Sequence, residues 1–122
     1  MRKCLDAYAL IEIANQNPVF AYLLNEDVVI TDITMAEFYG NLYRKLGYQT
    51  AEYWYKKMSF FCVPVSRDLL VKAIRLRIDK RKQNLSFFDC VGYTYSVENN
   101  LQFVTGDKEF KELPNVEFIK KD

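Results

Sequence analysis

Residues 3–14 of the chain read KCLDAYALIEIA, a short apolar stretch, one aspartate and then a helical pattern. Lys3–Leu5 has the length and apolar character of a buried strand, and Asp6 ends it. Leu10 and Ile13, which follow, recur at the spacing of one helix face. A strand that ends at an acidic residue and passes directly into a helix is a typical first unit of an alternating α/β fold.

The rest of the chain repeats this alternation of strands and helices. Further strands are predicted at residues 28–30, 60–65, 101–105 and 116–119, and the strand at 60–65 is expected at a sheet edge because Pro64 lacks a backbone donor. Helices are predicted at residues 18–24, 34–46, 50–58, 66–82 and 86–97, with one or two more turns at 108–113. This order predicts a three-layer α/β/α sandwich with a mostly parallel sheet of four to five strands, in a single domain of residues 1–122.

Composition restricts the chemistry that the chain can perform. Half of its 122 residues are hydrophobic and its net charge is +1, so we expect a real core and no globally basic surface. The sequence contains no histidine, which excludes histidine-dependent catalytic triads and histidine-bound metals within one chain. Three cysteines without a CxxC motif suggest neither a disulfide framework nor a zinc site. Without a long apolar run or a signal peptide, the chain is expected to be cytoplasmic and not bound to a membrane.

Three acidic residues are predicted to share one edge of the sheet, namely Asp6 after the first strand, Glu37 in the first turn of its helix and Asp107 after the fourth strand. Asp89, in the first turn of its own helix, joins them if that helix starts at the same edge. Open parallel sheets bind ligands outside the carboxyl ends of their strands. Carboxylates about 4 Å apart repel each other by roughly 4 kcal/mol at an effective dielectric near 20, so a cluster stays ionised only around a cation. An all-oxygen site suits Mg²⁺ or Mn²⁺, and the pattern therefore favours metal-assisted hydrolysis of a phosphate ester.

Each of these acids also has a structural alternative. Glu37 and Asp89 stand three residues after Thr34 and Ser86, which fits a capping box at the start of each helix. The other two acids are candidate turn, cap or loop residues that accept hydrogen bonds from neighbouring amides. These alternatives explain the acids singly. They do not predict that all four lie together, which depends on a strand order that the sequence leaves open.

The ordered set of motifs resembles a PIN-domain nuclease, in particular the small VapC-type toxin ribonucleases. The matching stretches span essentially the whole chain and are CLDAYALI (4–11), TMAEFY (34–39), SFFDCVGYTYS (86–96) and FVTGDKEF (103–110). The resemblance implies that Asp6, Glu37, Asp89 and Asp107 are the catalytic acids. It also implies that Asp6, Asp89 and Asp107 hold Mg²⁺ or Mn²⁺, with Glu37 as a further ligand or as the base that orients water.

The same resemblance implies two supporting residues and reveals two departures. Thr105 would supply a hydroxyl near the site, and Glu109 would be an outer ligand or water contact. The family often has Ser or Thr where this chain has Ala7, so one supporting hydroxyl is missing. The family often has Arg where this chain has Gly106, which leaves the phosphate contact to other basic residues.

Basic and aromatic residues are candidates for contacts with RNA or protein. Arg75, Arg77, Arg81 and Lys82, near the end of the long helix, are the candidate RNA-binding residues. Their alternative is a solvated helix face whose cations favour the helix dipole. The tyrosines and the tryptophan of residues 39–55 are candidates for base stacking, for a dimer or antitoxin interface, or for the core.

The sequence thus predicts a metal-dependent endoribonuclease. The resemblance implies that it is the toxin of a toxin–antitoxin pair, with an RNA substrate, a small antitoxin as partner and a homodimer as its assembly. Two alternatives stay open. One is a housekeeping RNA-processing nuclease with the same fold, and the other is a non-catalytic protein-binding module whose acids serve only as caps.

Overall fold

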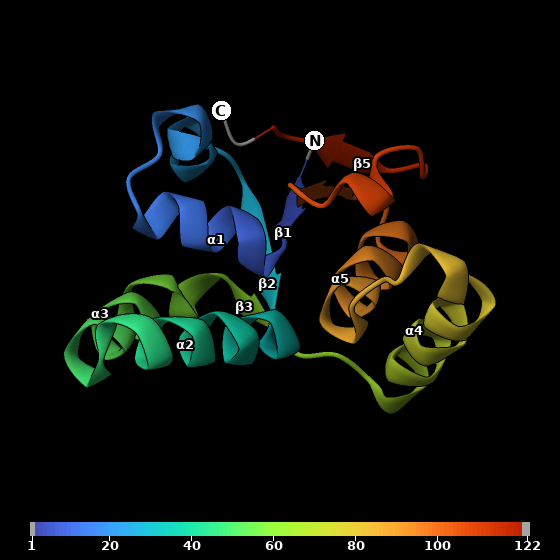
Figure 1. Cartoon of the computed structure of the whole chain (residues 1–122), viewed down its shortest axis with the longest axis horizontal. Helices are drawn as coiled ribbons and strands as arrows, with labels where there is room; N and C mark the ends of the chain where they lie inside the picture. The colour runs from blue at the N-terminus through green and yellow to red at the C-terminus, as the bar shows by residue number, and fades with distance from the viewer. Residues whose placement is uncertain (1, 121–122) are drawn as a thin grey trace.

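Five parallel strands form the sheet of the computed structural model, which describes residues 2–120 (Figure 1). The strands are β1 (Lys3–Leu5), β2 (Val28–Thr31), β3 (Cys62–Val63), β4 (Gln102–Thr105) and β5 (Val116–Phe118). Their order across the sheet is β3-β2-β1-β4-β5, so β1 lies at the centre. Each neighbouring pair is parallel. Within residues 2–120, no helix combines the length and the apolar character needed to cross a membrane.

Two groups of helices cover the two faces of this sheet (Figure 1). One group comprises α1 (Ala7–Ala14), the 3₁₀ segment η1 (Pro18–Asn25), α2 (Asp32–Leu46) and α3 (Tyr48–Met58). The other comprises α4 (Arg67–Asp79) and α5 (Phe87–Glu98), and the short 3₁₀ turns are η2 (Ser59–Phe61), η3 (Arg81–Gln83) and η4 (Lys108–Phe110).

Neighbouring strand residues point to opposite faces and build two separate cores. In β1, Leu5 packs with the core of α1, η1, α2 and α3, whereas Cys4 packs with that of α4 and α5. In β4, Val104 packs in the same core as Leu5, and Phe103 packs in the same core as Cys4. The predicted three-layer α/β/α sandwich is thereby confirmed, with all of its strands parallel.

The start of α2 differs from the prediction and changes the interpretation of Glu37. Thr31, rather than Thr34, caps this helix, because its Oγ1 accepts a hydrogen bond of 3.1 Å from the Thr34 amide. The helix therefore begins at Asp32, which places Glu37 in the second turn. The predicted capping box between Thr34 and Glu37 is wrong, so the cap alternative does not explain this acid.

Two other predicted boundaries were also wrong. The strand expected at residues 60–65 is limited to Cys62–Val63, because residues 59–61 continue α3 as a 3₁₀ turn and leave Phe60 88% exposed. Its predicted edge position is confirmed. The helix expected to reach residue 82 ends at Asp79, where Lys80 leaves helical geometry at φ −110° and ψ 32°.

Candidate active site

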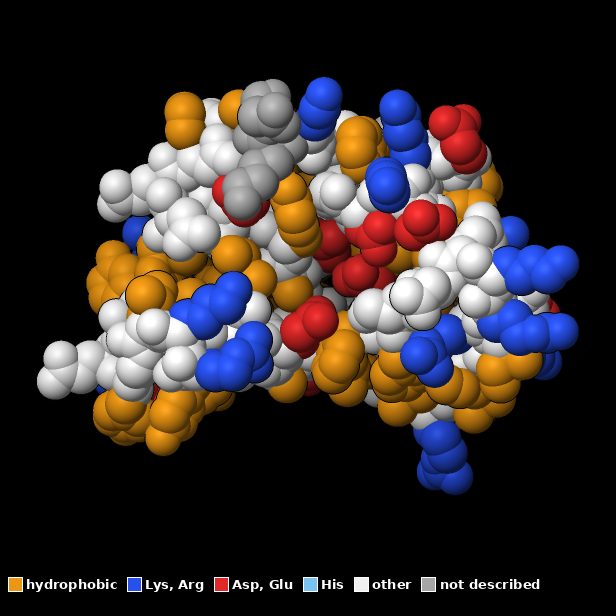
Figure 2. Space-filling view, viewed as in Figure 1, with side chains coloured by type: hydrophobic (Ala, Val, Ile, Leu, Met, Phe, Trp, Pro, Cys, Tyr) orange, Lys and Arg blue, Asp and Glu red, His pale blue; other side chains and the backbone are white. Residues whose placement is uncertain are grey.

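The strand order brings three of the four acids to one edge of the sheet. The chain leaves the central strand β1 toward β2 on one side and reaches β4 on the other, which makes the carboxyl end of β1 a topological switch point. Asp6 directly follows β1, and Asp107 comes shortly after β4. Glu37 lies in the second turn of α2, the helix that begins directly after β2. Figure 2 shows acidic side chains gathered in a hollow at the centre of one face of the molecule.

The first turn of α5 adds Asp89 to this group. Ser86 caps the helix, since its Oγ accepts a hydrogen bond of 3.2 Å from the Asp89 amide. Cys90 and Val91 are fully buried beside it and hold this part of α5 against the sheet. The charges of Asp6, Glu37 and Asp107 all act on Asp89. The four acids predicted from the sequence therefore form one electrostatic group, the acid cluster.

Two carboxylate oxygens of the acid cluster are buried without a hydrogen-bond partner, Oδ2 of Asp6 and Oε1 of Glu37. Asp6 is only 1% exposed, and its other oxygen, Oδ1, caps α1 by accepting a hydrogen bond of 2.7 Å from the Ala9 amide. The predicted bond from Asp6 to a neighbouring amide thus accounts for one oxygen and leaves the second without a hydrogen-bond partner. A buried acceptor without a partner is costly, so both oxygens fit a group that a cation completes.

Burial and mutual repulsion disfavour full ionisation of the acid cluster. Burial raises the pKa of Asp6 to about 7, and the charges of Glu37 and Asp107 add to this, while the Thr105 hydroxyl and the Ala9 amide act against it. Burial raises the pKa of Asp89 to about 8, again helped by its acidic neighbours. The pKa of Glu37 is raised by burial as well. A divalent cation would reverse these shifts, because it favours the charged form of every acid around it.

Thr105 and Glu109 hold the turn that carries Asp107. The Asp107 amide donates to Oγ1 of Thr105 over 3.0 Å, and Oδ1 of Asp107 accepts from the Glu109 amide over 2.9 Å. Asp107 therefore caps η4, as its structural alternative predicted. Thr105 is fully buried beside the acid cluster, whereas the Glu109 residue is exposed.

The donor set of the acid cluster suits a hard divalent ion, yet the side chains do not form a closed metal site. Among residues 2–120, no three acidic or cysteine side chains stand close enough to enclose a metal. All of the available ligands are carboxylate oxygens, the type preferred by Mg²⁺ and Mn²⁺. The donor chemistry therefore fits a hard divalent ion, whose charge would offset the mutual repulsion of the carboxylates.

The four candidate RNA-binding residues lie on the exposed end of α4 and on η3, and two of them also have structural contacts. Nε of Arg77 donates to the Leu85 carbonyl over 3.0 Å, and Nη1 of Arg81 donates to the Ile78 carbonyl over 3.3 Å. Both bonds brace the connection from α4 to α5. Arg75 and Lys82 are exposed on the same segment.

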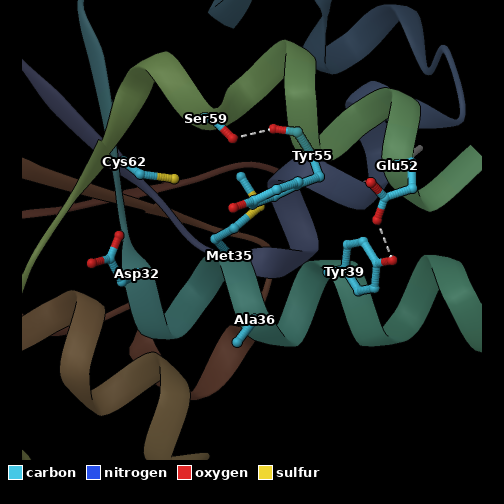
Figure 3. Close-up of a pocket in the computed structure, with 8 residues that line it drawn as sticks. All are labelled: Asp32, Met35, Ala36, Tyr39, Glu52, Tyr55, Ser59 and Cys62. Atoms are coloured by element: carbon cyan, nitrogen blue, oxygen red, sulfur yellow. Dashed lines mark hydrogen bonds between the residues drawn. The ribbon is translucent and has the colours of Figure 1, made fainter.

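A cavity of about 660 Å³ lies between α2 and α3, apart from the acid cluster (Figure 3). Its lining combines two acids with aromatic, sulfur-containing and small side chains, namely Asp32, Met35, Ala36, Tyr39, Glu52, Tyr55, Ser59 and Cys62. The Tyr39 hydroxyl donates to Oε2 of Glu52 over 2.6 Å, which joins the two helices across the cavity. None of the four clustered acids lines it, so the candidate catalytic residues lie elsewhere.

Tyr8 contacts Gly106, the residue directly before Asp107, and the sequence did not predict this contact. Its ring lies against Gly106, so closely that a Cβ atom at position 106 would stand 2.0 Å from Cε1 of Tyr8. The signal available in the sequence was an aromatic residue two positions after Asp6, combined with a glycine directly before Asp107. Neither residue indicates the contact by itself, because they are almost 100 positions apart.

Comparison with known proteins agrees with this geometry. A model of the PIN domain family matches residues 3–116. Among solved structures, the fold is similar to VapC20 of Mycobacterium tuberculosis, a toxin that cleaves the Sarcin-Ricin loop, with 17% identity, a TM-score of 0.81 and coverage of 96% of this chain and 98% of that chain. No match was found among the curated proteins.

Two further structures share the fold. A toxin–antitoxin complex from Klebsiella pneumoniae is 19% identical, with a TM-score of 0.77 and coverage of 94% of this chain and 95% of that chain. VapBC2 from Rickettsia felis, bound to a DNA fragment from its promoter, is 17% identical, with a TM-score of 0.73 and full coverage of both chains. These similarities extend the family match to the whole three-dimensional fold, and the chain belongs to the PIN domain family.

Proposed function

We propose that the chain is a divalent-metal-dependent endoribonuclease that hydrolyses RNA phosphodiester bonds at the acid cluster. The observation that carries this proposal is the pair of buried, unpartnered oxygens, Oδ2 of Asp6 and Oε1 of Glu37. Both belong to acids whose pKa values are raised, and Asp6 interacts with the charges of Glu37 and Asp107. Without a cation, these two buried acceptors have no hydrogen-bond partner, which is costly.

In this proposal, Asp6, Asp89 and Asp107 hold Mg²⁺ or Mn²⁺, and Glu37 is a further ligand or orients the attacking water. The chemistry that such a cation supplies is water activation and neutralisation of phosphate charge. Oδ2 of Asp6 is available to bind the cation, while Oδ1 accepts the Ala9 amide at the start of α1. Thr105 holds the Asp107 turn in place. No nucleophilic side chain is needed, which agrees with the absence of histidine.

RNA is the proposed substrate because the site is open, acidic at its centre and flanked by basic side chains. Figure 2 shows Lys and Arg side chains on both sides of the acidic hollow. Such side chains hold a phosphate backbone without reading its sequence. Among proteins with this fold, VapC20 is a toxin that cleaves the Sarcin-Ricin loop, which supports a structured RNA as substrate.

A toxin role with a small antitoxin as partner and a homodimer as its assembly is the proposed biological setting. Structures with this fold include toxin–antitoxin complexes, which supports the assignment. Exposed aromatic side chains on α2 and α3 offer surface for such partners, among them Tyr43, Tyr48, Tyr53 and Tyr55. An adjacent reading frame for a small protein, together with growth arrest on expression, would favour this role over housekeeping RNA processing.

The decisive experiment compares Asp89→Asn with Asp68→Asn in cleavage of a structured RNA with Mn²⁺. Both acids lie in the first turn of a helix, α5 and α4 respectively, but Asp68 is exposed outside the acid cluster. We expect Asp89→Asn, or EDTA, to lower the rate by at least about 100-fold, because several kcal/mol of charge stabilisation is lost. Asp68→Asn should cleave normally.

Full activity of Asp89→Asn, or cleavage that EDTA does not affect, would contradict the proposal. Titration with Mn²⁺ tests the non-catalytic alternative separately. If the unmodified chain binds no Mn²⁺ at millimolar concentration, the acid cluster is not a metal site, and the protein-binding module becomes the better explanation.

A further inference from the structure

Tyr8 belongs to the segment that begins with Asp6, and its ring contacts the residue directly before Asp107. It stands in the first turn of α1, the helix that Asp6 caps. The ring is half-buried and packs 5.9 Å, between ring centroids, from Phe20, which is fully buried. Phe20 thus fixes the Tyr8 ring from the side of the core.

The ring of Tyr8 also meets the turn that carries Asp107. Three of its carbons, Cε1, Cδ1 and Cζ, would lie 2.0, 2.3 and 2.6 Å from a Cβ atom at position 106. Gly106 is not among the residues with positive φ, so backbone conformation does not require a glycine there. The requirement is for space: any side chain at position 106 would have to displace the ring or the turn.

This contact completes a connection between the two segments that bear Asp6 and Asp107. On the strand side, the Asp6 amide donates to the Val104 carbonyl over 3.1 Å, which joins the end of β1 to β4. Beyond the strands, the Tyr8 ring against Gly106 is a second point of contact between the same segments. The turn itself is stiff, because Thr105 and Glu109 both bond to Asp107.

We infer that Tyr8 and Gly106 form a matched pair that sets the separation of the Asp6 and Asp107 carboxylates for metal binding. Tyr8 is a positioning residue in this role, and Gly106 is the space that it needs. This inference rests on the proposed function, since it concerns the same metal site.

The test is a double-mutant cycle read out by Mn²⁺ affinity of the full chain, measured by calorimetry rather than by activity. Gly106→Ala should weaken Mn²⁺ binding by at least about tenfold while Tyr8 is present. In a Tyr8→Ala background the same Gly106→Ala change should cost less than about threefold, because the ring that it meets is gone. Tyr8→Phe keeps the ring and should keep the affinity.

A separate variant controls for loss of stability alone. Leu101→Ala removes a buried side chain at the amino end of β4, opposite the end that leads to Asp107, and should lower the unfolding temperature with Mn²⁺ affinity unchanged. If Gly106→Ala does not fold, Tyr8→Ala against Tyr8→Phe makes the same distinction, since only the loss of the ring should weaken Mn²⁺ binding.

Equal effects of Gly106→Ala with and without Tyr8, unchanged affinity in Tyr8→Ala, or weakened binding in Leu101→Ala would each overturn the inference. Such results would leave the proposed function standing, because the unmodified chain would still bind Mn²⁺. Absence of Mn²⁺ binding by the unmodified chain would instead overturn the proposed function itself.

Discussion

At the scale of single residues, Asp6 uses its two carboxylate oxygens for different purposes. Oδ1 accepts the Ala9 amide and begins α1, while Oδ2 is buried without a partner. An asparagine keeps an acceptor for the cap, and an alanine does not. The two substitutions therefore separate the structural role of this residue from its role in the acid cluster.

We predict that Asp6→Asn folds at least as stably as the unmodified chain but fails to bind Mn²⁺. It removes a buried charge that repels its neighbours and retains the cap. Asp6→Ala should lose Mn²⁺ binding too, and should in addition be about 1 kcal/mol less stable than Asp6→Asn, the usual cost of a lost cap. Denaturant unfolding and Mn²⁺ titration measure the two effects, and equal stability of the two variants would refute the cap.

The raised pKa values predict how stability depends on pH without metal. Burial raises the pKa of Asp6 to about 7 and that of Asp89 to about 8, above the ordinary Asp value of 3.8. The folded chain therefore binds protons more tightly than the unfolded chain, and this contribution to stability is lost as pH rises from about 4 through 8.

We accordingly expect the unfolding temperature in EDTA to fall between pH 5.5 and pH 8.5. Asp89→Asn, which cannot ionise, should show a smaller fall over the same range. Saturating Mn²⁺ should reduce the fall in the unmodified chain, because the cation stabilises the ionised acids. An identical fall in Asp89→Asn would show that other groups cause the pH dependence.

At the scale of elements, the packing of α5 on the sheet depends on a glycine. A Cβ atom at Gly92 would lie 2.7 Å from Cε1 of Phe103 in β4, inside any normal contact. Gly40, in the middle of α2, has open space where its Cβ would be. The two positions are both within helices and differ only in their surroundings.

Alanine substitutions at these two glycines should therefore act in opposite directions. Gly92→Ala is expected to destabilise the fold by about 1–3 kcal/mol, because the helix must move from the sheet or the Phe103 ring must turn. Gly40→Ala is expected to stabilise it by about 0.5–1 kcal/mol through helix propensity. Chemical denaturation measures the free energy of unfolding of both variants. A loss of stability in both would contradict the packing described.

At the scale of the whole molecule, charge is balanced overall and separated locally. The net charge is only +1, while acids gather at the centre of one face with basic side chains around them (Figure 2). Any attraction to RNA must therefore come from a local patch and should weaken with added salt. Arg75 and Lys82 are the exposed candidates at the end of α4 and on η3.

We predict that Arg75→Glu with Lys82→Glu weakens RNA binding by about tenfold, measured in an Asp89→Asn background that cannot cleave. Arg67→Glu, at the opposite end of α4, is the control matched to Arg75→Glu alone and should bind RNA nearly as before. Mn²⁺ affinity, measured with Asp89 intact, should be the same with and without these substitutions. Equal losses in RNA binding from Arg67→Glu and from Arg75→Glu would indicate a diffuse charge effect instead of a patch.

The sequence by itself determined the order of strands and helices and the identity of the four acids, because apolar periodicity and strand-end acids are local signals. The resemblance in its motifs also identified the family. Boundaries that depend on competing local caps were less certain: Thr31, rather than Thr34, begins α2.

Only the tertiary structure decided what the acids share. The strand order puts β1 between β2 and β4, and this long-range packing makes one edge from segments that are far apart in the sequence. Burial of Oδ2 of Asp6 and Oε1 of Glu37, and the Tyr8 ring against Gly106, arise from the same packing. A sequence pattern records which side chains are present. Their desolvation and mutual distances are properties of the folded chain, and these turn four separate acids into a metal-binding candidate.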